Sequence, residues 1–530
     1  MNRCLPPSIR CRLRALSLTV LLLAVVFPTE SSAQTFRTDD PVVQRMWDLG
    51  MDGSQTRELA HSLIDSIGPR LAGSPELLAA QDWLMSIYAA WGVEARKEEY
   101  GEWDAWRQGT LHVDLVEPRV QSLDAEMMAW SPATDGPVDG TVVMPPVGLT
   151  ASTLPAWLES VQGRYVMISP PEPMCRAPQE LVANARPETV AAIEAERLEL
   201  RREWGERVGP LGRNQDEVEV LLDGSGVAGI LSSRWSNGWG VNKVFDTPAE
   251  RVVSLDISCE DYGLLYRMAV RGEEPVLRVD ADSEDLGMNP LFNVIAELPG
   301  SELPDEYVLL SAHLDSWHAA TGATDNGTGT IMMLEAMRIL KEAYPNPRRT
   351  ILVGHWGPEE VGLTGSRSFT EDHPEVLEGL QVMFNQDNGT WRVERIEGQG
   401  FLYSGQSIGR WMSRVPPEIS DHIALEFPGA QNNSGSDHTS FVCRGVPAFR
   451  FQSGYDEYRQ YTWHTNRDTY DKIVFDDLKE NATLAAMMVY AASEDPERTS
   501  REVTVLPPNP RTGQPRAWPT CSPARRSPGS

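Results

Sequence analysis

Short apolar runs alternate with helical segments between Phe292 and Asp387. The expected order is strand, helix, strand, helix, strand: Tyr307–Ala312, Thr328–Lys341, Thr350–His355, Thr364–Asp372 and Gln381–Asp387. Strands that are joined by helices in this way form a parallel sheet with right-handed crossovers, and the helices cover both of its faces. We therefore predict an α/β fold with a mostly parallel central sheet between two layers of helices.

A second pattern interrupts this domain. Residues 119–282 carry short β-branched runs separated by Gly and Pro, which predict an inserted β-rich domain. Within it, a stretch dense in Glu, Arg, Leu and Ala near 177–207 predicts one long, charged and solvated helix. The α/β domain is then discontinuous and consists of residues 34–118 and 283–495.

The two ends of the chain have patterns of their own. The helical pattern at the start of the α/β domain extends from Val43 to about Trp106. Residues 496–530 are rich in Pro and Arg and have no apolar period after Pro507, so we expect this tail to be disordered.

The N-terminus has the pattern of a secretory signal peptide. Arginines precede the apolar run Ala15–Phe27, and the small residues of 31–33 follow it. The run is shorter than the roughly 20 residues that a membrane-spanning helix needs, which favours a signal peptide of residues 1–33 over a permanent anchor. We expect a secreted or periplasmic protein with no stable membrane anchor after cleavage. The cysteines that remain after cleavage are Cys175, Cys259, Cys443 and Cys521. In an oxidising compartment they can form one or two disulfides, whose pairing stays open.

The charge of the chain argues against nucleic acid as a partner. The sequence has 47 Lys and Arg against 76 Asp and Glu, a formal net charge of −29. A protein of this charge repels a phosphate backbone and has no surplus of cations to displace its counterions. We expect no binding to DNA or RNA.

Metal-seeking side chains stand at the predicted carboxyl ends of the strands. They follow the three strands in turn and include the loop before the first helix: His313, Asp315, Asp325, Glu359, Glu360 and Asp387. Ligands of open α/β sheets bind beyond these strand ends. Carboxylates gathered there would repel each other by an energy on the order of several kcal/mol unless a cation neutralises them. Because imidazole and carboxylate both bind zinc, we predict a metal centre, to which the downstream His464 offers another imidazole.

These motifs together resemble a known family. His313-x-Asp315, Asp325-Asn326-Gly327, Glu359-Glu360, Asp387 and His464-Thr465-x-x-Asp468-Thr469 look like the motif of the co-catalytic dizinc aminopeptidases and carboxypeptidases. The stretches His313–Trp317 and Ser436–Phe441 are similar to the plasma glutamate carboxypeptidase branch of that family. The insertion resembles the protease-associated domain of several members, and the similarity covers about residues 45–495.

The resemblance implies two Zn²⁺ ions and a set of ligands. Asp325 would bridge the ions, His313 and Asp387 would complete one site, and Glu360 and His464 would complete the other. The family also implies a cis peptide bond after Asp325.

Two further roles come from the same resemblance. Glu359 would be the general base that acts on a metal-bridging hydroxide. Asp315 would hydrogen-bond to the far nitrogen of His313 and so define its tautomer.

Other residues are candidates for the substrate side of the site. His438, next to Asp437, has either a substrate-side or a structural hydrogen-bonding role. Trp463 stands where some relatives carry a tyrosine that supports the oxyanion, which puts that support in doubt here. Three arginines are candidate anchors for a substrate carboxylate: Arg367, Arg450 and Arg459.

The function predicted from the sequence is that of a secreted zinc exopeptidase acting on short peptides. Two alternatives remain, a glutaminyl cyclase-like acyltransferase with a single zinc ion and a catalytically inactive receptor or scaffold on the same fold. The insertion counts against the first alternative, and the complete ligand set counts against the second. Aminopeptidase, carboxypeptidase and dipeptidase specificity all stay open, and the insertion either shapes the cleft or mediates a homodimer.

Overall fold

A computed structural model describes residues 38–431, 435–455, 457–508 and 511–529. The predicted signal peptide lies outside these residues. Residues Thr38–Ser530 form one compact unit. Within the described ranges, no helix combines the length and the apolar character needed to cross a membrane.

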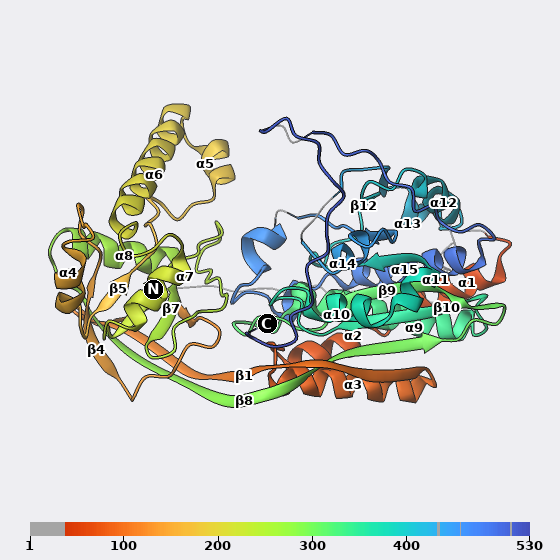
Figure 1. Cartoon of the computed structure of the whole chain (residues 1–530), viewed down its shortest axis with the longest axis horizontal. Helices are drawn as coiled ribbons and strands as arrows, with labels where there is room; N and C mark the ends of the chain where they lie inside the picture. Colours follow the sequence, from red (N-terminus) through yellow and green to blue (C-terminus); the bar gives the residue numbers. More distant parts are fainter. Residues whose placement is uncertain (1–37, 432–434, 456, 509–510, 530) are drawn as a thin grey trace, which may run out of the picture. The chain divides into compact units, whose positions relative to one another are not determined.

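One mixed sheet connects the α/β domain to the insertion (Figure 1). Its strands pair in this order: β14 (Ala448–Arg450), β11 (Leu380–Asn385), β9 (Leu303–His313), β10 (Arg349–Trp356), β8 (Val276–Leu298), β4 (Val138–Val143), β5 (Tyr165–Met167), β6 (Gly229–Ser232), β7 (Val253–Ile257) and β3 (Ala125–Met127). The long strand β1 (Glu94–Glu117) pairs with β8 and with β2 (Gln121–Ser122). Strands β14, β11, β9 and β10 are mutually parallel, and the predicted α/β fold is confirmed.

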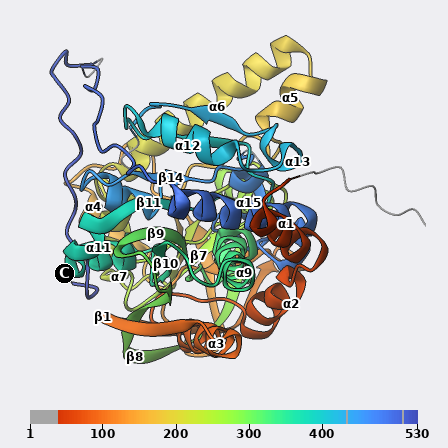
Figure 2. The same ribbon diagram turned by 90° about the vertical axis from the view of Figure 1, so that its right-hand side faces the viewer.

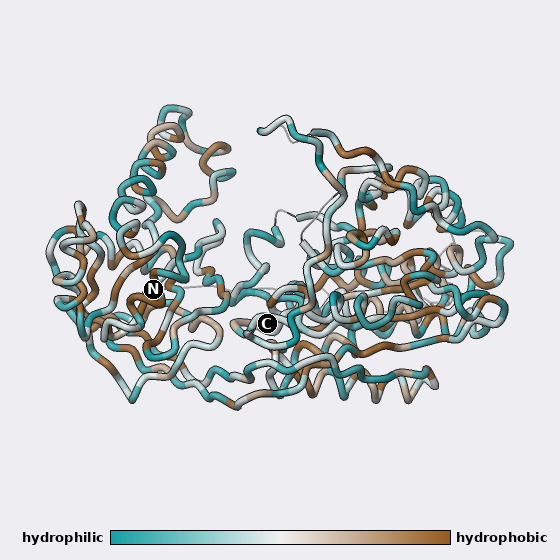
Figure 3. Tube along the Cα trace, viewed as in Figure 1, coloured by the Kyte–Doolittle hydropathy of each residue, from teal (hydrophilic) through white to brown (hydrophobic). Residues whose placement is uncertain are grey.

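Helices cover this parallel part of the sheet. Those of the α/β domain are α1 (Pro41–Trp47), η1 (Asp48–Asp52), α2 (Thr56–Ala60), η2 (His61–Ile67), α3 (Pro75–Trp91), η3 (Ala323–Gly327), α9 (Thr328–Ala343), α10 (Thr364–Asp372), α11 (Pro374–Gly379), α12 (Ser404–Met412), α13 (Pro417–Ser420), α14 (His438–Val442), η4 (Tyr458–Thr462), η5 (Tyr470–Lys472) and α15 (Phe475–Glu494). Helix α9 is buried along most of its length, and it packs against α15 and β9. Figure 3 shows hydrophobic residues concentrated in these central elements.

Residues 94–106 form the first half of β1 and do not continue the predicted helical pattern. Helix α3 ends at Trp91, because Gly92 adopts a left-handed conformation with φ of 66°. The following residues pair with β8 from Glu94 opposite Glu297 to Trp106 opposite Asp285, with register shifts between Glu99 and Gly101 and between Ala105 and Trp106. Figures 1 and 2 show α3 lying along this pair of strands. Pairing with a strand far away in the sequence has overridden the local helical preference.

The predicted long helix of the insertion is divided in two. The insertion carries α4 (Leu154–Ser160), α5 (Pro178–Asn184), α6 (Pro187–Val208), α7 (Gln215–Asp223) and α8 (Cys259–Val270). Arg186 is extended, with ψ of 143°, because a residue before proline is disfavoured in a helical conformation. Helix α6 starts at Pro187, and it is mostly hydrophilic (Figure 3).

The insertion and the α/β domain share a hydrophobic core. Tyr165, Leu255 and other apolar residues of the insertion pack in one cluster with Leu71 and Trp317. Strand β8 also crosses the predicted boundary at 282/283. The boundaries of the two domains stay predictions.

The described part of the tail differs from the expected disorder. A disulfide joins Cys443 to Cys521, and a second one joins Cys175 to Cys259 in the insertion. The guanidinium of Arg526 pairs with Asp372 at 2.8 Å. The backbone carbonyl oxygen of Arg526 accepts a hydrogen bond from the backbone N–H of Glu102. These tertiary contacts hold a segment whose composition lacks an apolar period of its own.

Candidate metal centre

Three parallel strands bring the predicted ligands to one edge of the sheet. Strand β9 ends at His313, the loop after β10 carries Glu360, and Asp387 follows β11. Asp325 lies in η3, just ahead of α9, and the peptide bond that follows it is cis. The far segment after η4 brings in His464.

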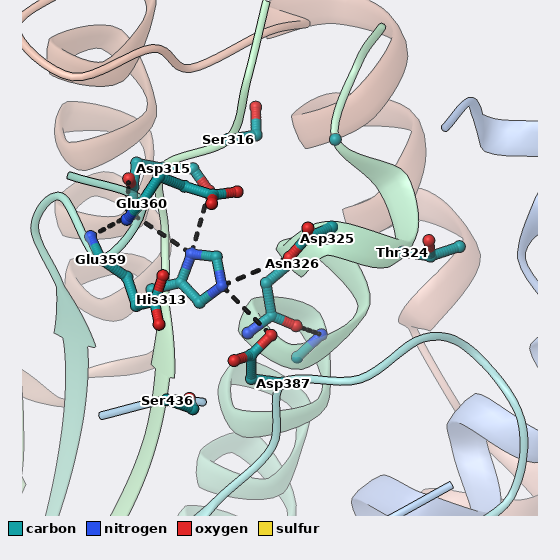
Figure 4. A network of polar contacts seen from close by, with 12 residues as sticks. His313, Asp315, Ser316, Thr324, Asp325, Asn326, Glu359, Glu360, Asp387 and Ser436 are labelled. Carbon is teal, nitrogen blue, oxygen red and sulfur yellow. Dashed lines mark hydrogen bonds and ion pairs between the residues drawn. The ribbon is translucent and has the colours of Figure 1, made fainter. Parts of the chain in front are cut away.

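The five predicted ligands form two groups that share Asp325. In the first group, His313 Nε2 lies 3.3 Å from Asp387 Oδ1 and 3.5 Å from Asp325 Oδ1. In the second, His464 Nε2 lies 3.0 Å from Glu360 Oε2 and 3.5 Å from Asp325 Oδ2. His313, Asp325 and Asp387 are buried, and the side chains of Glu360 and His464 are only 4% and 9% exposed. Figure 4 shows Asp325 and Asp387 beside the same nitrogen of the His313 ring.

This donor set suits divalent cations. Three carboxylates and two imidazoles are buried together, although buried carboxylates repel one another. Asp325 Oδ2 and Glu360 Oε1 are buried and have no hydrogen-bond partner among the described residues. Buried polar atoms normally have such partners, so these two oxygens fit metal ligation.

Asp315 connects the His313 ring to the loop of the two glutamates. Its Oδ1 lies 3.2 Å from His313 Nδ1, as predicted for a residue that defines the tautomer (Figure 4). The same carboxylate accepts hydrogen bonds from the backbone N–H groups of Glu359 and Glu360, at 2.9 and 3.1 Å. Asp315 therefore positions residues of both groups.

Glu359 lies next to the two ligand groups and belongs to neither. Figure 4 shows its side chain extending toward the His313 ring. Burial raises the pKa of Glu359 well above its usual range, while the nearby His313 opposes that rise. A carboxylate with a raised pKa in this position is suited to accept a proton from water.

Aromatic residues that the sequence patterns did not indicate surround the second group. Trp317 Nε1 donates a hydrogen bond of 2.9 Å to Glu360 Oε2. The rings of Phe245, from the insertion, and His464 meet edge to face at a centroid distance of 4.8 Å. The backbone N–H of Val244 donates to the carbonyl oxygen of His464. No local motif indicates these contacts, because they join segments that are distant in the sequence.

Trp463 packs on its neighbour in the chain. Its ring centroid lies 3.9 Å from that of His464, and the Arg459 guanidinium lies 3.9 Å above the indole. Lys243 of the insertion also contacts this indole, at 4.4 Å. Trp463 and Arg459 thus support the His464 ring.

Tyr458 is a further residue that the sequence patterns did not indicate. It begins η4 and is only 4% exposed. Burial, together with the adjacent charge of Asp325, raises the pKa of its phenol well above the usual range. The sequence motifs do not indicate a phenol beside Asp325, because Tyr458 lies outside the motif that begins at His464.

The other predicted candidates lie deeper in the domain. Asp437 and His438 are completely buried at the start of α14, and neither nitrogen of the His438 ring has a hydrogen-bond partner among the described residues, so its role stays a prediction. Arg450 donates a hydrogen bond of 2.6 Å to the carbonyl oxygen of Asp387. Arg367 lies on α10, away from the two ligand groups.

A cavity of about 1000 Å³ opens beside Glu360. Three indoles line it, those of Trp103, Trp106 and Trp130. Its charged lining residues are Asp104, Asp246, Glu250, Asp285, Glu360 and Arg525. A cleft of this size accepts a small organic ligand or a short peptide.

Comparison with known proteins shows which proteins this chain is similar to. Residues 293–489 match the model of peptidase family M28. Carboxypeptidase Q of Rattus norvegicus is 26% identical over 444 residues, which are 83% of this chain and 85% of that protein.

Solved structures share the fold. A peptidase M28 precursor from Shewanella amazonensis SB2B has a TM-score of 0.66 and 24% identity, covering 88% of this chain and 98% of that chain. A zinc aminopeptidase from Bacillus subtilis has a TM-score of 0.55 and 18% identity, with the same two coverages.

Proposed function

We propose that the chain is a metallo-exopeptidase that releases terminal residues from short peptides with two Zn²⁺ ions and Glu359 as the general base. The match of residues 293–489 to peptidase family M28 and the similarity to carboxypeptidase Q support this proposal. One observation carries the proposal: two buried ligand groups share Asp325, and Glu359 lies next to both. Zinc dependence agrees with the chemistry of the donor set. The number of ions is part of the proposal.

The ions would be held by the two groups described above. When bound, two zinc ions would polarise a peptide carbonyl and lower the pKa of a water molecule. Asp315 keeps the Nδ1 proton of His313 in place, so that Nε2 is free to act as a ligand.

Glu359 moves the proton in the proposed reaction. Its carboxylate takes a proton from the attacking water and later delivers it to the nitrogen of the leaving amine. The raised pKa suits the first of these transfers, because it makes the carboxylate a stronger base.

The indole-lined cleft supports the choice of a short peptide as substrate. It lies beside Glu360, and its walls come from both the α/β domain and the insertion. We propose that the insertion shapes this cleft; a homodimer stays a prediction. The two disulfides support a secreted or periplasmic location, because such bonds persist in oxidising compartments.

The test is an assay of the purified chain before chelation, after chelation and after zinc is restored. The substrates are aminoacyl anilides, free dipeptides and dipeptides blocked at either end. We expect hydrolysis to disappear on chelation and to return with about two zinc ions per chain. Hydrolysis that survives full removal of metal would refute the proposal, and the blocked substrates decide which terminus must be free.

A further inference from the structure

A second cavity, of about 440 Å³, lies between α10, α14 and the C-terminal tail. It is lined by Arg367, Thr370, Gln431, Thr439, Ser440, Cys443, Arg444 and the tail residues 517–522. None of the five metal ligands lines it, and neither does Glu359. The cavity is therefore separate from the metal centre.

The charge of this cavity is opposite to that of the whole chain. Arg367 and Arg444 line it, and no Asp or Glu is among its described lining residues. The chain as a whole has a net charge of −29, so acidic residues should dominate an average part of its surface. Hydroxyl groups from both α14 and the tail accompany the two guanidinium groups.

Several polar groups of the lining have no partner within the described ranges. The Arg367 guanidinium makes no hydrogen bond or ion pair there, whereas the exposed Arg444 forms only a long ion pair with Glu371, at 4.0 Å. Both polar atoms of the Gln431 side chain are buried without a hydrogen-bond partner in the same residues. Buried polar groups usually have partners, so the Gln431 amide and the partly buried Arg367 guanidinium are available to a ligand.

Nearby carboxylates help to keep Arg367 in its cationic form. Burial lowers the pKa of Arg367, whereas the carboxylates of Asp437, Glu359 and Glu371 act in the opposite direction and Arg525 adds to the lowering. An arginine side chain remains protonated under such conditions.

The walls of the cavity are held in place by the tail. The Cys443–Cys521 disulfide crosses one side. Trp518 Nε1 donates a hydrogen bond of 2.8 Å to the carbonyl oxygen of Val442, and the backbone N–H of Ala524 donates to Glu371 at 3.0 Å. The site is thus formed before a ligand arrives, which reduces the entropic cost of binding.

We propose that this cavity binds a small oxyanion, a carboxylate or a phosphate, between Arg367 and Arg444. Guanidinium groups recognise both anions with paired, charge-assisted hydrogen bonds. The bound anion joins α10, which starts just after the loop of Glu359 and Glu360, to the tail. The proposal does not depend on the peptidase reaction.

Calorimetric titration of the full-length secreted chain tests the site. The probes are inorganic phosphate and glutarate, each titrated into zinc-loaded and into chelated protein, because oxyanions also bind zinc. We expect one saturable site that remains after chelation. If glutarate alone binds there, the ligand is a carboxylate, and if phosphate alone binds, it is a phosphate.

Variants assign that binding to the cavity. Arg367→Gln should weaken it at least tenfold, and Gln431→Glu, which places a negative charge in the lining, should abolish it. Arg186→Gln is the control, because Arg186 is an exposed arginine of the insertion. This variant should bind the anion as tightly as the parent chain does. Binding that vanishes with the metal, or that Gln431→Glu leaves within twofold of the parent, would overturn the proposal.

Discussion

Asp468 Oδ2 accepts a hydrogen bond of 2.9 Å from the backbone N–H of Asp325, the ligand that both groups share. Its other oxygen accepts one of 2.7 Å from the backbone N–H of Thr324. Asp468 is 3% exposed and comes from the segment after His464, so it holds the η3 backbone from a distant part of the chain. The position of the shared carboxylate depends on this contact.

Replacement of Asp468 should therefore weaken both of the proposed zinc sites. We expect Asp468→Ala to lower zinc affinity about 10- to 100-fold, the usual effect of losing a residue that orients a ligand. Competition with a chromophoric chelator measures the affinity. The exposed neighbour Asp471 is the matched control, and equal affinities in Asp468→Ala and Asp471→Ala would contradict the expectation.

Glu359→Gln should separate metal binding from catalysis. The amide cannot accept the proton of water, and we expect kcat to fall about 10²- to 10⁴-fold. Elemental analysis should still find the zinc content of the parent protein, because Glu359 belongs to neither ligand group. Glu196→Gln, on the exposed surface of α6, controls for the loss of one charge. Full activity in Glu359→Gln would show that Glu359 is not the general base.

Trp317→Phe tests the hydrogen bond to Glu360. Phenylalanine keeps an aromatic ring against Phe245 and Trp130 but cannot donate to Glu360 Oε2. We expect a loss of roughly 1.5–3 kcal/mol in the binding of zinc proposed for the second ligand group, the usual value of a hydrogen bond to a charged group. Isothermal titration with zinc measures it. Trp239→Phe changes an exposed indole and should leave zinc binding as it is.

The pair of His373 and Glu98 should make stability depend on pH. The hydrogen bond to Glu98, 2.9 Å long, raises the pKa of His373 above its usual value. Folding then favours protonated His373, so this stabilisation is complete below the unfolded pKa of about 6.5 and is lost as the pH rises through the higher folded value.

The Tm difference between the parent and His373→Gln should be large at about pH 6 and should shrink toward alkaline pH. Thermal unfolding monitored by circular dichroism measures it. His61→Gln, at an exposed position, is the control for the change in Tm that the loss of any surface histidine causes. A difference that is the same at all pH values would show that the contact does not involve titration.

Local patterns were sufficient to predict much of the α/β domain. Alternating strands and helices predicted β9, α9, β10, α10 and β11, and the polar residues after those strands predicted the ligand candidates. The same approach failed for residues 94–106, whose partner strand begins far downstream at Val276. It also missed the break before Pro187, although a proline inside a helical pattern indicates one.

The amino-acid sequence by itself determined the parallel sheet and the residues at its carboxyl edge, because hydrophobic periodicity and strand ends are properties of neighbouring residues. Only the tertiary structure decided which groups support those ligands: Trp317 on Glu360, Phe245 on His464, and Asp468 on Asp325. The same holds for the tail that closes the cavity of Arg367 and Arg444. Such contacts join segments separated by long stretches of chain, and their geometry exists only once the insertion, the sheet and the tail have packed together.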